Sequence, residues 1–248
     1  MQNAPADHVL APGEAAMEFN RRDLLKRAAT VATGGSLTFI VGAGPASAAT
    51  RATLRMGSRG PEVLALQRRL TSLGYWLGAA DGHFGDLTRQ AVVAVQKVGS
   101  LYRNGECGPM TWSQVDAGKR PRARSAKGHV IEVNKATQTL LIVDSAVVKR
   151  IYNVSTGSNQ RYFSEGKRQI ALTPSGSFRV FRHVDAWDSG PLGSLYRPKY
   201  FNRGIAIHGY TSVPSTPASH GCCRVSLPAM DSLWGAGGLP LGTPVLVY

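Results

Sequence analysis

The apolar residues that follow residue 54 recur at the period of a helix. Gly60-Pro61 opens this pattern, and proline is favoured at the first position of a helix. Gly74 closes it, because glycine is common just past a helix end. The apolar positions between them, three or four residues apart, are Val63, Leu66, Leu70 and Leu73. We therefore predict an amphipathic helix between Gly60 and Gly74.

Two further helices complete this segment. Asp86 is a good N-cap for a helix that ends before Gly99, and Pro109 begins a short third helix. The apolar face of the second helix consists of Leu87, Ala91, Val95 and Val98. So few helices in so short a segment give a small bundle with a thin core. Residues 54–117 are therefore predicted to be a binding module rather than an enzyme.

From His129 onward the pattern changes to short runs rich in β-branched residues. We predict strands at residues 130–133, 139–143, 147–154, 177–181, 204–208 and 243–247, and one helix at 229–234. These elements describe a mainly-β domain over residues 129–248. Residues 118–128 are rich in Lys and Arg and poor in apolar residues, which is typical of a solvated basic linker. The fold class is expected to be α+β, with two domains.

The chain is strongly basic. It has 29 Lys and Arg residues against 15 Asp and Glu residues, a formal net charge of +14. The charges of residues 1–48 cancel, so the excess lies downstream of them. Nucleic acid, anionic lipid and anionic polymers are the usual partners of such a protein, and composition alone does not choose among them.

Residues 1–48 have the parts of an export signal in the right order. Asn20-Arg21-Arg22-Asp23-Leu24-Leu25-Lys26 resembles a twin-arginine signal, with Leu24 where Phe is usual. A moderately apolar run from Ala28 to Gly44 follows, and Ala46-Ser47-Ala48 has the form of a cleavage site. The run is marginal for crossing a bilayer, so we expect cleavage and no stable membrane insertion afterwards. An exported, cell-wall location favours anionic wall polymers over nucleic acid as the partner.

The candidate chemistry lies in Ser219-His220-Gly221-Cys222-Cys223-Arg224, with His208-Gly209 upstream. Three cysteines, Cys107 included, are an odd number for an exported protein and indicate at least one free thiol. A thiol becomes a good nucleophile when a base or a positive charge is near it. His208, His220 and Arg224 can supply these, and the N–H groups of Gly221 and Cys222 could face one oxyanion.

The residues alone leave two other interpretations open. Lone histidines and cysteines are more often structural than catalytic. His208 and His220 could also join Cys222 or Cys223 as zinc ligands, although no carboxylate that could activate water is evident nearby. Nucleophilic catalysis by Cys222 is the hypothesis that we favour.

The helical segment resembles the three-helix peptidoglycan-binding domain found on many wall enzymes. The motifs that carry the resemblance are Arg59-Gly60-Pro61-Glu62-Val63, Leu66-Gln67-Arg68-Arg69-Leu70, Asp81-Gly82-His83-Phe84-Gly85 and Gly108-Pro109-Met110-Thr111-Trp112. Val95 departs from the aromatic residue usual in that family. The resemblance places the Asp81-Gly82 turn near a glycan groove, whereas composition explains it as a simple turn.

Residues from about 128 to the end resemble the YkuD-type L,D-transpeptidase domain. The motifs are Thr173-Pro174-Ser175-Gly176, Gly204-Ile205-Ala206-Ile207-His208-Gly209, Ser219-His220-Gly221-Cys222-Cys223-Arg224 and Gly242-Thr243-Pro244-Val245. The resemblance implies a sandwich-like fold. Cys223 departs from the branched apolar residue of the family. We expect it to be a core residue, and oxidation of the adjacent thiols to a strained disulfide is the alternative.

Carried over by position, the resemblance assigns a role to each site residue. It makes Cys222 the nucleophile and His208 its base, oriented by the carbonyl of Gly209. It makes His220, Gly221 and Cys222 the frame of the oxyanion site. The residues expected to bind substrate are Arg224, Ser219, Tyr196 and Phe201, although Tyr196 and Phe201 could equally be core residues.

The predicted function is formation of 3→3 cross-links between peptidoglycan stem peptides. Cys222 would form a thioester with a tetrapeptide stem, release D-Ala and pass the acyl group to an amine of a neighbouring stem. No cofactor or metal is predicted. The alternatives are an L,D-carboxypeptidase that uses water as acceptor, a zinc-dependent wall peptidase and a non-catalytic wall-binding protein.

Overall fold

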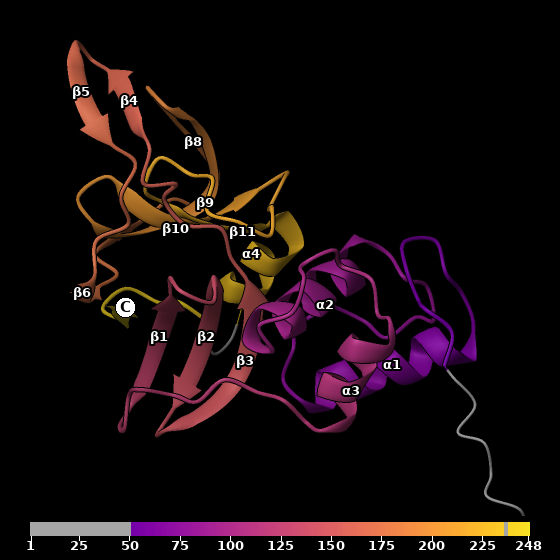
Figure 1. Cartoon of the computed structure of the whole chain (residues 1–248). Helices are drawn as coiled ribbons and strands as arrows, with labels where there is room; N and C mark the ends of the chain where they lie inside the picture. Colours follow the sequence, from indigo (N-terminus) through magenta and orange to yellow (C-terminus); the bar gives the residue numbers. More distant parts are fainter. Residues whose placement is uncertain (1–50, 236–237) are drawn as a thin grey trace, which may run out of the picture. The chain divides into compact units, whose positions relative to one another are not determined.

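The computed structural model describes residues 51–235 and 238–248, so the predicted export signal at residues 1–48 lies outside the described residues. Three helices come first along the chain: α1 (Pro61–Ser72), α2 (Asp86–Val98) and α3 (Pro109–Asp116) (Figure 1). They confirm the predicted three-helix module. One detail of the prediction was wrong: Gly85 is the N-cap of α2, and Asp86 is its first helical residue, paired with Arg89 at 2.8 Å.

Buried amide side chains hold the turns of this helical module. The Gln67 Nε2 donates to Asp81 Oδ1 at 2.9 Å, while its Oε1 accepts from the Gly82 N–H at 2.8 Å. The same pattern recurs later in the chain with Gln96, Asn104 and Gly105. Buried polar groups need such partners, so the Asp81-Gly82 turn is a structural element of the module.

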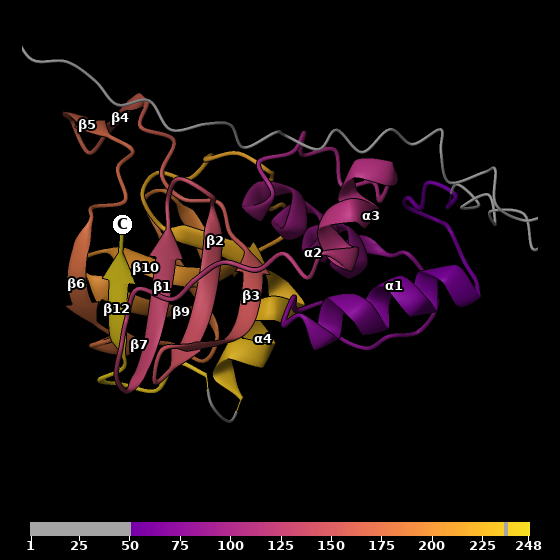
Figure 2. The same ribbon diagram turned by 60° about the horizontal axis from the view of Figure 1, so that its bottom comes forward.

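The β-domain contains two larger sheets. The first has the order β3-β2-β1-β12-β6, and only its β1–β12 pair is parallel. Figure 2 shows β12, β1, β2 and β3 side by side. Its strands are β1 (His129–Asn134), β2 (Thr139–Asp144), β3 (Val147–Asn153), β6 (Gly176–Arg179) and β12 (Pro244–Val247). The sequence predicted each of them.

Most strands of the second sheet were not predicted from the sequence. Its order is β11-β10-β9-β7, and β8 also pairs with β9. Its strands are β7 (Arg182–His183), β8 (Trp187–Gly190), β9 (Gly193–Asn202), β10 (Ile205–Tyr210) and β11 (Cys223–Ser226). A separate hairpin consists of β4 (Arg161–Ser164) and β5 (Lys167–Ile170), and α4 (Leu227–Trp234) follows β11. Of these elements the sequence predicted only β10 and α4.

The two sheets face each other across one apolar core. Buried side chains of β1 and β2 meet those of β10, β11 and α4 in a single cluster. Representative members are Ile131, Ile142, Ile207, Val225 and Met230. This sandwich, with the helical module before it, confirms the expected α+β fold with two domains.

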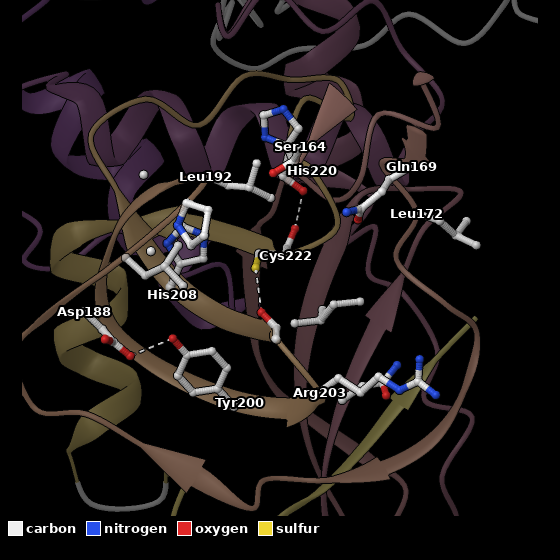
Figure 3. Close-up of a pocket in the computed structure, with 18 of the residues that line it drawn as sticks. Ser164, Gln169, Leu172, Asp188, Leu192, Tyr200, Arg203, His208, His220 and Cys222 are labelled. Atoms are coloured by element: carbon white, nitrogen blue, oxygen red, sulfur yellow. Dashed lines mark hydrogen bonds between the residues drawn. The ribbon is translucent and has the colours of Figure 1, made fainter. Parts of the chain in front are cut away.

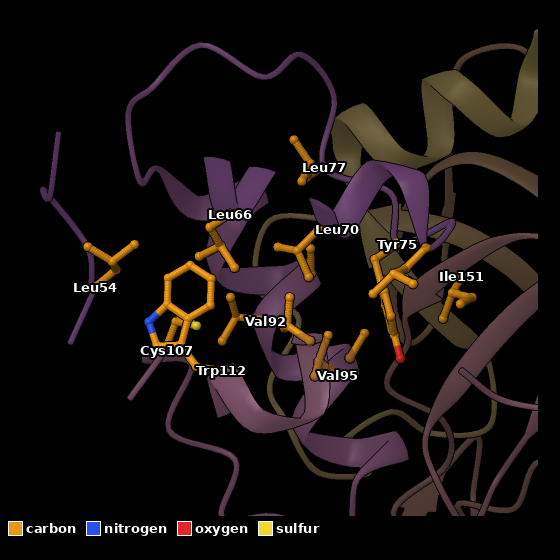
Figure 4. Packing of buried hydrophobic residues seen from close by; sticks show 14 of the residues in the cluster. Leu54, Leu66, Leu70, Tyr75, Leu77, Val92, Val95, Cys107, Trp112 and Ile151 are labelled. Atoms are coloured by element: carbon orange, nitrogen blue, oxygen red, sulfur yellow. The ribbon is translucent and has the colours of Figure 1, made fainter. Parts of the chain in front are cut away.

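The central strand β2 of the first sheet is buried on both faces. Along β2 the side chains alternate: Leu140 and Ile142 enter the core of the sandwich, whereas Leu141 and Val143 pack against the helical module. Figure 4 shows this second cluster, in which Ile151 of β3 lies close to Tyr75. By their internal contacts, the helical module and the β-domain belong to one compact unit.

The basic segment 118–128, predicted as a linker, is mostly exposed and also makes defined contacts with the β-domain. The N–H groups of Arg124 and Ser125 donate to the buried Glu132 carboxylate at 2.9 and 2.6 Å. The Arg124 guanidinium lies 3.9 Å from the centre of the Tyr248 ring, and the Arg120 side chain donates to the Val148 carbonyl. These contacts hold the segment in place.

A buried lysine joins the helical module to the first sheet. Lys97 of α2 is 1% exposed, and its Nζ donates to the carbonyls of Gln138 and Val154 at 3.0 and 2.9 Å and to the Asn153 side chain. Burial, helped by the charge of Arg103, lowers the pKa of Lys97 to about 6.

No described helix is both long and apolar enough to span a membrane.

We predict that Lys97→Met flattens the pH dependence of stability. Between about pH 6 and the ordinary lysine pKa, the unfolded chain binds a proton that folded Lys97 does not. The free energy of unfolding of the wild type therefore rises with pH across this window. In the variant, the slope of this free energy against pH should be smaller by about 1.4 kcal/mol per pH unit. Urea unfolding at pH 7 and pH 9 measures it. Lys127→Met, at an exposed position, is the control, and an equal slope in all three proteins contradicts the prediction.

Candidate active site

The parallel pairing of β10 with β11 brings the two halves of the sequence motif together. In this pairing Ile207 lies opposite Cys223 and His208 lies opposite Arg224. Side chains alternate along β11, so Cys223 and Val225 enter the core while Arg224 lies on the other side. Cys222, just before the strand, is half-buried on that same side.

His208 and Cys222 line one pocket of about 940 Å³ (Figure 3). The β4–β5 hairpin contributes Tyr162 and Gln169 to its wall, and the β8–β9 hairpin contributes Leu192. A pocket of this volume has the size of sites that enclose small ligands or short peptides.

Ser219 shapes the loop that presents Cys222. Its hydroxyl donates to the Cys222 carbonyl at 2.5 Å and accepts from the Gly221 N–H at 3.0 Å. Gly221 has φ 140°, a conformation that side chains disfavour, and its carbonyl accepts from Thr173 Oγ1 at 2.6 Å. Ser219 thus lines the pocket, and its side chain also orders the loop that presents Cys222.

The oxyanion site that the sequence predicted keeps one of its two donors. The Gly221 N–H is already bonded to Ser219, so it is not available to an oxyanion. Within the described residues, by contrast, no acceptor receives the Cys222 N–H. This group remains as the free backbone donor next to the thiol.

The Cys222 sulfur lies beside the turn that joins β9 to β10. Its thiol donates to the Gly204 carbonyl at 3.8 Å, and the Ala206 N–H donates to the sulfur at 3.5 Å. Burial raises the pKa of the Cys222 thiol, while the Ala206 N–H and the Arg224 charge oppose this increase. The direction of the shift leaves Cys222 a neutral thiol at rest.

His208 is held in one orientation by its own backbone neighbour. Its ring is 1% exposed, and Nδ1 lies 2.9 Å from the Gly209 carbonyl. A carbonyl only accepts, so Nδ1 carries the hydrogen and the Nε2 of the neutral ring is left as an acceptor. Burial lowers the pKa of His208 to about 4, and the Arg224 charge acts in the same direction. Gly209 thus occupies the place predicted for it.

Gly209 also has a steric reason to be glycine. A Cβ at this position would lie 2.7 Å from the Tyr196 ring. That ring packs over the strand while its hydroxyl donates to Asp231 at 2.9 Å. Tyr196 is therefore a support for β10 and not part of the pocket wall.

Phe201 is likewise not in the pocket wall, contrary to the prediction. It is 3% exposed and packs in the core against Phe178. Its neighbour Tyr200 lines the pocket instead, because side chains alternate along β9. Nothing in the sequence distinguished Tyr200 from Tyr196 and Phe201 as the residue that lines the pocket.

Arg224 and His220 both line the pocket. The Arg224 side chain donates to the Ala218 carbonyl at 3.2 Å, and its guanidinium lies 4.2 Å from the centre of the Tyr210 ring. Its Nε is buried and has no partner among the described residues. His220 is exposed and makes an edge-to-face contact with Tyr162 at 4.7 Å.

The other cysteines are buried structural residues. Cys223 is 0% exposed within the core of the sandwich, where burial raises the pKa of its thiol. Cys107 is buried in the helical module. All three cysteines are free thiols, which favours the core interpretation of Cys223 over a disulfide with Cys222. In residues 51–235 and 238–248, no three His, Cys, Asp or Glu side chains are grouped to hold a metal ion.

The comparisons with known proteins agree with both halves of the chain. Residues 128–247 match the model of the L,D-transpeptidase catalytic domain, YkuD, and residues 59–115 match that of a peptidoglycan binding domain. An N-acetylmuramoyl-L-alanine amidase, CwlM, from Mycobacterium tuberculosis is 37% identical over an aligned length of 83 residues, and the match covers 29% of this chain. The chain spans only 20% of the length of that amidase.

A solved structure matches nearly all of the described residues. The crystal structure of the L,D-transpeptidase (residues 123–326) from Xylanimonas cellulosilytica is 49% identical, with a TM-score of 0.77. The match covers 79% of this chain and 97% of that one. With this identity and coverage, and with both domain models in order along it, the chain belongs to the L,D-transpeptidase family.

Proposed function

We propose that this protein is an exported, cysteine-dependent L,D-transpeptidase that forms 3→3 cross-links in peptidoglycan. The observation that carries the proposal is the presence of Cys222 and His208 in the wall of one pocket, with His208 oriented by the hydrogen bond from its Nδ1 to the Gly209 carbonyl. This arrangement gives a nucleophile, a base of defined tautomer and a neighbouring backbone donor.

The first half-reaction starts from a neutral pair. His208 Nε2 takes the thiol proton as the Cys222 sulfur attacks the carbonyl carbon of the third stem residue. The Cys222 N–H donates to the oxygen of the tetrahedral intermediate, where negative charge develops. Arg224 stabilises the thiolate that forms, because its charge favours the anion. His208 then returns the proton to the departing amine, and the C–N bond to D-Ala breaks.

The second half-reaction transfers the acyl group. An amine of a neighbouring stem attacks the thioester carbon, so a C–N bond forms and the C–S bond breaks. His208 accepts the proton of the amine and returns it to the sulfur of Cys222. The product is a cross-link between the third residues of two stems, and the free enzyme is restored.

The helical module supports peptidoglycan as the partner. It belongs to a peptidoglycan-binding family and has a hollow of about 350 Å³ lined by Trp112, Arg69 and Glu62. A second point of attachment raises the local concentration of stems near the pocket. The export signal expected in residues 1–48 and the net charge of +14 support an extracytoplasmic location beside anionic wall polymers.

We predict that the acid limb of the pH profile of kcat/KM has its midpoint near pH 4. His208 must be unprotonated to act as base, and its pKa is about 4, far below the ordinary value of about 6.5. Activity therefore persists through mildly acidic pH and is lost as His208 is protonated. Arg224→Gln removes a charge that lowers this pKa, so the limb should move upward in pH. An acid limb near 6.5 in the wild type would contradict this resting state.

The reaction itself is tested by incubating the enzyme with a tetrapeptide stem and analysing it by intact mass. We expect an acyl adduct on Cys222, release of D-Ala and accumulation of cross-linked dimers. Cys222→Ala should lose all three, whereas Cys223→Val, at a buried core position, should keep them. The adduct distinguishes a thiol enzyme from a zinc peptidase, which would be inhibited by chelators and carry no adduct.

The products of the same incubation decide between the remaining alternatives. Release of D-Ala with monomeric tripeptide alone would identify an L,D-carboxypeptidase, in which water is the acceptor. Neither adduct nor products would indicate a protein that only binds the wall.

A further inference from the structure

A second polar cluster lies in the pocket apart from Cys222. It consists of Arg182 of β7, Asp188 of β8 and Tyr200 of β9, and all three line the pocket. The Arg182 Nη2 and the Tyr200 hydroxyl both donate to Asp188 Oδ2, at 2.9 and 2.7 Å. Figure 3 shows Asp188 beside Tyr200, on the wall near His208. The mechanism above uses none of these side chains.

The cluster is held in place and keeps unused hydrogen-bonding groups. Tyr200 is only 7% exposed, and the Arg182 guanidinium lies 4.5 Å from the centre of its ring. Within the described part of the chain, Asp188 Oδ1 accepts no hydrogen bond, and Arg182 donates from Nη2 alone. The pocket thus presents a free carboxylate oxygen next to a guanidinium with free donors.

A purely structural role explains this cluster poorly. The Arg182 and Asp188 side chains are 52% and 24% exposed. An ion pair with so much exposure contributes little to stability. The other charged side chains of the pocket are Glu165, Arg203 and Arg224, and none of them is paired with Asp188. Asp188 and Arg182 therefore offer a neighbouring negative and positive charge to whatever enters the pocket.

We propose that Arg182 and Asp188 bind the α-amino-acid group at the end of the side chain of the donor stem's third residue. The ammonium of that group pairs with Asp188 Oδ1, and the carboxylate on the same carbon pairs with the free donors of Arg182. This inference rests on the proposed function, and it specifies which stem peptides the enzyme acylates fastest.

The chemistry of transfer favours the donor stem over the acceptor stem at this position. An ion pair with a carboxylate stabilises the ammonium form of an amine, and an ammonium has no lone pair with which to attack. The side-chain amine of the donor does not react, so pairing it with Asp188 costs nothing in the chemical step. The same pairing would disable the amine of the acceptor. Remote contacts of this kind position the donor carbonyl at the nucleophile.

The test compares two donor tetrapeptides that differ only in the third residue. Diaminopimelate carries both the ammonium and the carboxylate at its side-chain end, whereas lysine carries the ammonium alone. Asp188→Asn should lower kcat/KM for D-Ala release roughly tenfold with both donors. Arg182→Gln should lower it roughly tenfold with the diaminopimelate donor only. Asparagine can still accept from Tyr200, so the pocket wall is retained.

Controls separate this subsite from the nucleophile. Asp185→Asn changes a neighbouring aspartate that pairs with Arg197 outside the pocket, and it should behave as wild type. Iodoacetamide reports on Cys222, because Cys107 and Cys223 are buried, and its rate should be unchanged in each variant. If the alkylation rate and the thermal unfolding are unchanged in a variant, a lower kcat/KM reflects weaker recognition of the substrate.

The rates of D-Ala release and of transfer to the acceptor in the two variants decide the proposal. The proposal is overturned if D-Ala release is unchanged in both variants, or if only transfer to the acceptor falls while D-Ala release stays at the wild-type rate. Equal loss with both donors in Arg182→Gln would also contradict the assignment of the carboxylate. A wild-type enzyme that releases no D-Ala from either donor instead refutes the proposed function and is recognised before any variant is compared.

Discussion

The parallel pairing of β10 with β11 is the constraint on which the active site depends. It places His208 opposite Arg224 and puts the residue just before β11, Cys222, in the wall of the pocket. Because strand side chains alternate, a slip of one residue would bury Cys222 and expose Cys223. The Ser219 hydroxyl, bonded to the loop at two points, and the positive φ of Gly221 fix the approach to this strand. The register therefore decides which of two adjacent thiols can react.

The helical module contributes to the architecture as well as to binding. The first sheet is the middle layer of the described structure, with the second sheet on one face and the helical module on the other. Lys97 joins α2 to this sheet through the Gln138 carbonyl. Gln90 of the same helix accepts a hydrogen bond from the Asn153 side chain and donates to the Val213 carbonyl at 3.4 Å. Val213 belongs to the loop that leads from β10 to Ser219. Contacts of the helical module thus reach the loop that carries the catalytic motif.

The sequence predicted the helices, the strands rich in β-branched residues and the places of Cys222 and His208, because periodicity and a short motif determine these locally. It did not predict β9, in which Arg197-Pro198 and several polar residues hide the strand pattern. Nor could it choose Tyr200 over Phe201, since alternation puts one of two neighbours in the pocket and the other in the core without indicating which is which. The run Leu140–Val143 was predicted as a strand, but the pattern did not identify the two layers that bury it on both faces. Asp188 and Arg182 meet only through the sheet, so no local pattern joined them.

The proposed chemistry requires that His208 rests as a neutral ring with its hydrogen on Nδ1 and its Nε2 able to take the proton of Cys222. Nitrogen-15 NMR of the histidine rings at neutral pH, with His208 assigned by comparison with His208→Gln, tests it directly. We expect a protonated Nδ1, hydrogen-bonded to the Gly209 carbonyl, and an unprotonated Nε2. An imidazolium at neutral pH, or a neutral ring with its hydrogen on Nε2, would contradict it.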